Sequence, residues 1–188
     1  TQTVDPLKLD LPGGESAVKI VKKLLAEGYR FVSSREVESK GNEWTELYWS
    51  HPNVSALLEV DLQPEPDDRS DLAMLSCIAL MDLSEPLDEA KKREEALNAI
   101  GKKTDFSFEF SFRQGSDPKH TVCSVSTSEE FDIFGADSED QGENVSERFQ
   151  ALRKVIEPLK KLAKPVKAPE TEAGPSDPVG KALKASAV

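Results

Sequence analysis

Long apolar runs are absent from this sequence of 188 residues, and none approaches the ~18–20 uncharged residues of a membrane span. The two cysteines, Cys77 and Cys123, are too few to indicate a disulfide framework. Both lie in apolar, strand-like runs, so we expect two buried reduced thiols, with a single disulfide as the alternative. The first residues show neither a basic nor an apolar leader region, so we expect a cytoplasmic protein.

Positive charge is also scarce. The chain has 24 Lys and Arg against 35 Asp and Glu, a net charge of -11. The dense basic clusters, at 91–93 and 153–164, lie in helical patterns among acidic or apolar residues, which is typical of solvated helix faces. Because nucleic acids and anionic membranes repel an acidic surface, we expect neither as a partner. A protein partner with a basic surface is electrostatically easier.

Catalytic motifs are missing as well. The sequence contains no phosphate-binding glycine loop, no dinucleotide fingerprint, no nucleophile elbow and no zinc-protease motif. His120 and Cys123 are three residues apart in a strand-like run, so they point to opposite faces and cannot form a nucleophile–base pair. We therefore predict a non-enzymatic protein without a cofactor or a metal ion.

Hydrophobic periodicity predicts nine elements. Helical spacing occurs at 16–27, 86–100 and 144–162, and Pro158 must break the last pattern. Strand patterns occur at 30–37, 44–50, 54–62, 72–83, 105–113 and 119–127. The order α-ββββ-α-ββ-α predicts an α+β fold with a mainly antiparallel sheet of about six strands and three helices.

Composition divides the chain into three parts. We predict an extended N-terminal arm at 1–14, a single α+β domain at 15–163 and a flexible, proline-rich tail at 164–188. The element order and the low pI resemble those of the secretion-chaperone-like fold. That resemblance implies a small, acidic, cytoplasmic dimer that binds unfolded segments of partner proteins. The fourth strand and the long tail depart from its pattern.

Two groups of carboxylates could carry chemistry. Glu59 and Asp61 share a strand face, as do Glu130 and Asp132, but apolar residues occupy the opposite faces. The simpler interpretation is that both pairs lie on the solvent-exposed face of a sheet. The second group is an acidic loop, interpreted as solvated, as a weak cation site or as a docking surface for a basic partner: Asp137, Glu139, Asp140 and Glu143.

Aromatic residues gather in two places. Trp44, Glu46 and Tyr48 share one strand face, and Glu46 suggests that this face is partly exposed, a composition typical of an interface hot spot. We predict partner binding there, with ordinary sheet packing as the alternative. The other place is a stripe of phenylalanines on one strand face, which favours core beneath a helix but could line a ligand cavity or a subunit interface: Phe106, Phe108, Phe110 and Phe112.

These observations favour a non-enzymatic protein-interaction module, chaperone-like or adaptor-like and homo-oligomeric. It would bind its partner through an acidic and aromatic sheet surface and through its tail. Two alternatives stay open. One is a structural subunit of a larger viral or bacterial assembly with terminal arms. The other is a small-ligand-binding protein or enzyme that uses the phenylalanine-lined face.

Overall fold

The computed structural model describes residues 4–11, 14–64, 72–132 and 141–170, and it confirms the predicted α+β fold and element order. The helices are α1 (Glu15–Ala26), α2 (Leu87–Lys91), α3 (Glu94–Gly101) and α4 (Gln141–Ile156). The strands are β1 (Arg30–Ser39), β2 (Asn42–Ser50), β3 (Leu57–Pro64), β4 (Leu72–Leu83), β5 (Glu109–Gln114), β6 (Thr121–Asp132) and β7 (Ala163–Pro165). The helix predicted at 86–100 is divided into α2 and α3.

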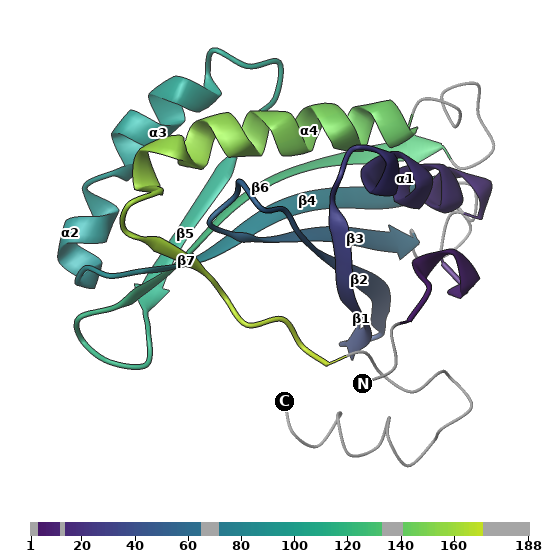
Figure 1. Cartoon of the computed structure of the whole chain (residues 1–188), viewed down its shortest axis with the longest axis horizontal. Coiled ribbons are helices and arrows are strands. Elements are labelled where there is room, and N and C mark those ends of the chain that lie inside the picture. Colours follow the sequence, from purple (N-terminus) through teal and green to yellow (C-terminus); the bar gives the residue numbers. More distant parts are fainter. Residues whose placement is uncertain (1–3, 12–13, 65–71, 133–140, 171–188) are drawn as a thin grey trace.

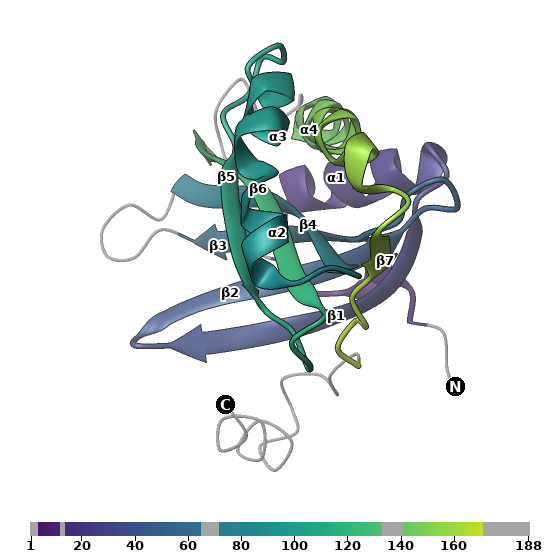
Figure 2. The same cartoon turned by 90° about the vertical axis from the view of Figure 1, so that its left-hand side faces the viewer.

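The strands form one antiparallel sheet in the order β1-β2-β3-β4-β6-β5. The short strand β7 pairs with Met81–Leu83 of β4, beyond the end of β3. Strand direction turns steadily from β5 to β1, as expected from the twist of β-sheets (Figure 2). The helices α1, α3 and α4 lie on one side of this sheet (Figures 1 and 2).

A two-residue turn joins β1 to β2 and fixes their register. Lys40 and Gly41 have φ angles of 52° and 82°. Positive φ at both central residues is the type I′ arrangement that matches the twist of a hairpin. Residues at equal distances from this turn therefore face each other, and Arg35 lies opposite Glu46.

The helix ends follow the predicted signals. Gly28, with a φ of 89°, follows α1, and the Tyr29 amide donates to the Leu24 carbonyl at 3.0 Å. This is the glycine stop known as the Schellman motif. The α4 helix ends at Ile156, and Pro158 lies in the 3-10 helix at Glu157–Leu159, as its missing amide requires.

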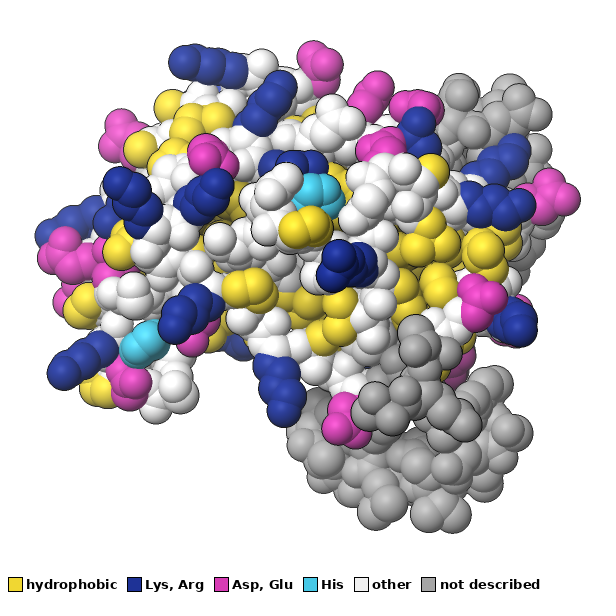
Figure 3. Space-filling view, in the orientation of Figure 1, with side chains coloured by type: hydrophobic (Ala, Val, Ile, Leu, Met, Phe, Trp, Pro, Cys, Tyr) yellow, Lys and Arg dark blue, Asp and Glu magenta, His cyan; other side chains and the backbone are white. Residues whose placement is uncertain are grey.

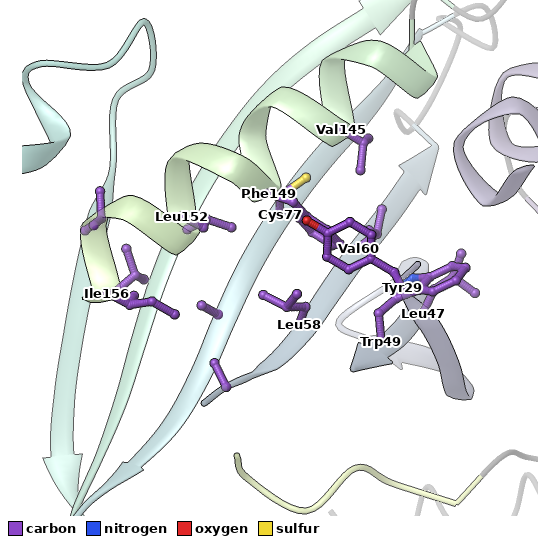
Figure 4. Close-up of a cluster of buried hydrophobic side chains, with 14 of the residues drawn as sticks. Tyr29, Leu47, Trp49, Leu58, Val60, Cys77, Val145, Phe149, Leu152 and Ile156 are labelled. Carbon is purple, nitrogen blue, oxygen red and sulfur yellow. The ribbon is translucent and has the colours of Figure 1, made fainter. Parts of the chain in front are cut away.

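The core lies between the helix layer and the sheet. Val145, Phe149, Leu152 and Ile156 of α4 point toward β2, β3 and β4 (Figure 4). Trp49 of β2 is completely buried in this layer. Cys77 and Cys123 are both free and buried, as predicted, and burial raises the pKa of each thiol, that of Cys123 to about 12.

Structure extends beyond the predicted domain at both ends. A 3-10 helix occupies Pro6–Lys8, with Leu9 and Leu11 packed against the core. At the other end, β7 ties Ala163–Pro165 to β4, although the tail was predicted to begin at 164. Residues 171–188 of the predicted tail lie outside the described residues.

The described surface fits the expected distribution of charge. Basic and acidic side chains are interspersed on the face in Figure 3 instead of forming a single basic field. No helix in the described ranges is long and apolar enough to cross a membrane.

Candidate functional site

A polar cluster lies on β1, β2 and β3, on the face of the sheet opposite the helices. Strand register arranges its residues in two rows across the strands. One row runs from Ser33 through Tyr48 to Glu59, and the next from Arg35 through Glu46 to Asp61. Directly paired residues of antiparallel strands share a face, so both rows project to the same side.

Glu46 is the centre of the cluster. Its carboxylate accepts hydrogen bonds from Arg35 Nε at 2.8 Å, from the Tyr48 hydroxyl at 2.6 Å and from Trp44 Nε1 at 3.0 Å. Arg35 Nη2 adds an ion pair at 2.6 Å. Since a buried carboxylate needs such donors, this network explains how Glu46 can leave water.

The prediction that this face is partly exposed is wrong for two of its three residues. Glu46 is 7% exposed and Tyr48 is 3% exposed, whereas Trp44 is half-buried. The physical reason is the cross-strand guanidinium of Arg35, together with the indole and phenol donors, which replace water around the carboxylate. Partner binding by Trp44, Glu46 and Tyr48 stays a prediction.

The interpretation that Glu59 and Asp61 lie on the solvent-exposed face of a sheet is also wrong. Glu59 is 5% exposed and Asp61 is half-buried. Burial, a hydrogen bond with Glu59 and the negative charges of Glu59 and Glu46 raise the pKa of Asp61 to about 11. Burial raises the pKa of Glu59 as well. The cluster therefore retains a proton on this carboxyl pair at neutral pH.

Two oxygens of this face have no hydrogen-bond partner among the described residues. They are Ser33 Oγ and Asp61 Oδ1, and both atoms are shielded from solvent. Ser33 is 3% exposed. Unsatisfied buried polar atoms are rare in native proteins, so each one needs an explanation, such as a bound water or ion.

The acidic loop is described only in part. Asp137, Glu139 and Asp140 lie outside the described residues. Glu143 belongs to the first turn of α4, where its exposed carboxylate accepts a hydrogen bond from Lys23 of α1 at 2.5 Å. Glu130, on β6, is exposed as expected.

A second feature is a groove between α3 and β5. It is open, has a volume of about 590 Å³ and is lined by Glu94, Glu95, Asn98, Phe108, Glu109 and Phe110. The three carboxylates are exposed, and the two phenylalanines are half-buried.

The phenylalanine stripe is core only in part. Phe108, Phe110 and Phe112 pack against the buried cluster under the helix layer, yet all three stay half-buried because β5 is the last strand of the sheet. Phe106 lies before β5, with the Arg148 guanidinium 4.5 Å from its ring centroid.

Sequence reasoning missed Arg35 and the convergence of three carboxylates. A signal was present, because Arg35 and Glu46 stand at equal distances from the Lys40-Gly41 turn. A two-residue hairpin there makes them neighbours. Asp61 comes into the same row only through the longer connection between β2 and β3, whose register local patterns do not specify.

Comparison with known proteins gives no family. No protein-family model matches the chain, and no curated protein matches it. Among solved structures, an uncharacterized protein from Methanothermobacter thermautotrophicus aligns with a TM-score of 0.44 at 14% identity, covering 78% of this chain and 97% of that chain. YbjN from E. coli, named as a candidate transcription regulator, aligns with a TM-score of 0.42 at 12% identity, covering 84% and 100%. Likenesses of this strength carry no conclusion about function.

Proposed function

We propose that this chain is a non-enzymatic protein-interaction module that binds an extended segment of a partner protein along β5. The observation that carries the proposal is the edge of β5, which no described strand covers, beside an acidic, phenylalanine-lined groove. This keeps the acidic and aromatic character predicted for the binding surface but moves the surface from Trp44–Tyr48 to the opposite border of the sheet.

The edge of β5 supplies the backbone part of the interaction. β5 pairs with β6, and no other strand in the described ranges pairs with it. Figure 2 shows β5 at the border of the sheet, with α2 and α3 beside it. An edge strand presents free amide and carbonyl groups, and a partner segment can add to them as a further strand.

The groove supplies the side-chain part and suggests the chemistry of the partner. Phe110 and Phe112 lie on the helix side of β5, because they pair with Val125 and Cys123 of the core face. Glu94 and Glu95 of α3 stand exposed in the groove beside Phe110. A segment that combines apolar residues with Lys or Arg would contact both the rings and the carboxylates.

A second copy of this chain is the competing occupant of the same edge, because two β5 strands could pair with each other. This would give the homo-oligomer predicted from the sequence. Sedimentation across a range of protein concentrations separates the two cases. A dimer whose formation blocks peptide binding would favour self-pairing over partner capture.

The test uses a fluorescent peptide of alternating valine and lysine, matched in length to β5. We expect saturable binding by fluorescence anisotropy and slower hydrogen exchange at the β5 amides. Replacing Glu94 and Glu95 together by lysine should weaken binding by about tenfold or more, since it reverses two charges at the groove.

The matched control replaces Glu38 and Glu43 by lysine. These exposed residues face each other near the tip of the β1–β2 hairpin, at the far border of the sheet. Equal weakening by both double variants would show that peptide binding depends only on net charge. Equal binding of a valine–glutamate peptide would show that the groove does not select basic side chains. Either result would contradict the proposed binding site. Unchanged exchange at β5 would contradict strand addition.

A further inference from the structure

The carboxylates of Glu46, Glu59 and Asp61 converge on the face of the sheet opposite the helices. One oxygen from each residue can be chosen so that all three lie within 4.8 Å of one another. Glu46 and Glu59 are buried, and half-buried Asp61 leaves a route to solvent. The three residues come from two adjacent paired strands, so the backbone holds them in place.

Charge within the cluster is unbalanced. Three carboxylates face the guanidinium of Arg35, whose positive charge acts on both Glu59 and Asp61. With all three carboxylates ionised, two negative charges would stay uncompensated, so the ion-free cluster retains a proton and a bound divalent cation would displace it. Buried charge of this kind is costly unless it is paired or coordinates a metal ion.

Two unsatisfied atoms point to a missing ligand. Asp61 Oδ1 belongs to the cluster itself and is buried with no hydrogen-bond partner from the described residues. Ser33 Oγ, on the same face and in the row that contains Tyr48 and Glu59, is also buried with no partner from that part of the chain. A buried carboxylate oxygen that accepts no hydrogen bond is a vacant acceptor for a cation.

We propose that Glu46, Glu59 and Asp61 bind one divalent cation, and that this ion is Ca²⁺. Carboxylate oxygens are the ligands that hard cations prefer. Ca²⁺ accepts six to eight oxygens at about 2.3–2.6 Å in flexible geometry, whereas Mg²⁺ demands near-ideal octahedral geometry at about 2.0–2.1 Å, so three carboxylates held by two paired strands suit Ca²⁺ better. Water entering beside Asp61 completes the coordination, and the ion joins β2 to β3.

The network around Glu46 prepares this site. Arg35, Trp44 and Tyr48 fix the orientation of its carboxylate through three donors. Oriented ligands lose less freedom when the ion binds, and partners outside the ligand set commonly change metal affinity by about 10–100-fold. The site lies on the face opposite the helices, so its occupancy does not depend on the binding of a partner at β5.

The experiment is calorimetric titration of the chelator-treated full chain with CaCl₂ at neutral pH. We expect one ion per chain and much weaker binding of MgCl₂. At roughly 100 times the dissociation constant, the melting temperature should rise by about 5–10 °C. Asp61→Asn should weaken binding by more than about tenfold.

A second readout reports the place of binding. Trp44 Nε1 lies 3.0 Å from the Glu46 carboxylate, so its indole should sensitise the luminescence of Tb³⁺, an ion that replaces Ca²⁺. Trp44→Phe should remove most of that signal, and because Trp44 also orients Glu46 it should weaken Tb³⁺ binding, so the two proteins are compared at saturating Tb³⁺. Glu59→Gln gives a further ligand variant if Asp61→Asn fails to fold.

Glu130→Gln is the matched control, because it removes one exposed carboxylate from β6. It should leave affinity and luminescence unchanged. Absence of heat, melting shift and luminescence at millimolar Ca²⁺ or Tb³⁺ overturns the proposal. Equal loss in Glu130→Gln and Asp61→Asn also overturns it, because the ion would then be held by the general acidity of the surface.

Discussion

Asp61 illustrates the cost of burying a carboxyl group beside two others. Its pKa is raised from 3.8 to about 11, first by burial and then by Glu59 and Glu46. The folded state therefore binds a proton that the unfolded state has released. The contribution of Asp61 to stability is fully present below pH 3.8 and is lost as the pH rises toward about 11.

We expect Asp61→Asn to stabilise the metal-free protein at pH 8, by about 1–3 kcal/mol, since the amide fills the site without requiring a proton. At pH 4 the two proteins should differ little. Urea unfolding at a series of pH values, with a chelator present, measures this. An equal effect of Asp61→Asn at both pH values would mean that no proton is retained.

The two tryptophans should respond differently to truncation. Trp49 is completely buried and packs edge-on against Phe31, with ring centroids 5.5 Å apart. Trp49→Ala should cost about 3–5 kcal/mol, as expected for a large core aromatic. Trp44→Ala should cost clearly less, because Trp44 is half-buried and loses one hydrogen bond to Glu46. Thermal melting compares them, and equal losses would place both in one core.

Among the elements, the β1–β2 hairpin carries a residue in a backbone conformation that suits it poorly. Lys40 has a φ of 52°, a left-handed conformation that costs a residue with a β-carbon about 1–2 kcal/mol. Asparagine tolerates this conformation, and Asn-Gly is the preferred sequence of this turn. Lys40→Asn should raise stability by about 0.5–1 kcal/mol. Gly41→Ala is the opposing control and should lower it, because Gly41 has a φ of 82°.

Element order follows from local patterns, which explains why it could be predicted. Helical or alternating spacing is visible within each segment, and the stops at Gly28 and Pro158 are local as well. Alternation begins at residue 105 and predicts a strand from there, whereas β5 begins at Glu109. The Thr104 hydroxyl donates to the Gly101 carbonyl at 2.7 Å and accepts from the Phe106 amide at 3.2 Å. These bonds hold the residues between α3 and β5 in a turn.

The polar cluster could not be predicted in the same way. Alternation identifies which residues share a face, and it placed Glu59 and Asp61 together correctly. It does not tell whether that face meets water. The answer depends on neighbours from other strands, above all Arg35, and therefore on register across β1, β2 and β3.

On the scale of the whole molecule, β7 determines where the domain ends. It pairs with Met81–Leu83 of β4, and Ala163 is buried there. A chain ending at Pro165 should melt at nearly the temperature of the full chain. A chain ending at Leu162 loses this pairing and should melt several degrees lower, since about 1 kcal/mol corresponds to roughly 2–4 °C. Equal melting temperatures for the two truncated chains would make β7 irrelevant to stability.

The position of α4 late in the chain also matters while the protein is being synthesised. Strands β1 to β4 leave the ribosome well before Gln141–Ile156, yet the apolar face around Leu47, Leu58 and Cys77 is covered by that helix. A nascent chain that stops before α4 therefore exposes the apolar face of the sheet. Exposed apolar surface of this kind aggregates or binds chaperones. Ribosome-bound chains stalled at this point should bind a hydrophobic dye, and release of the completed chain should abolish that binding.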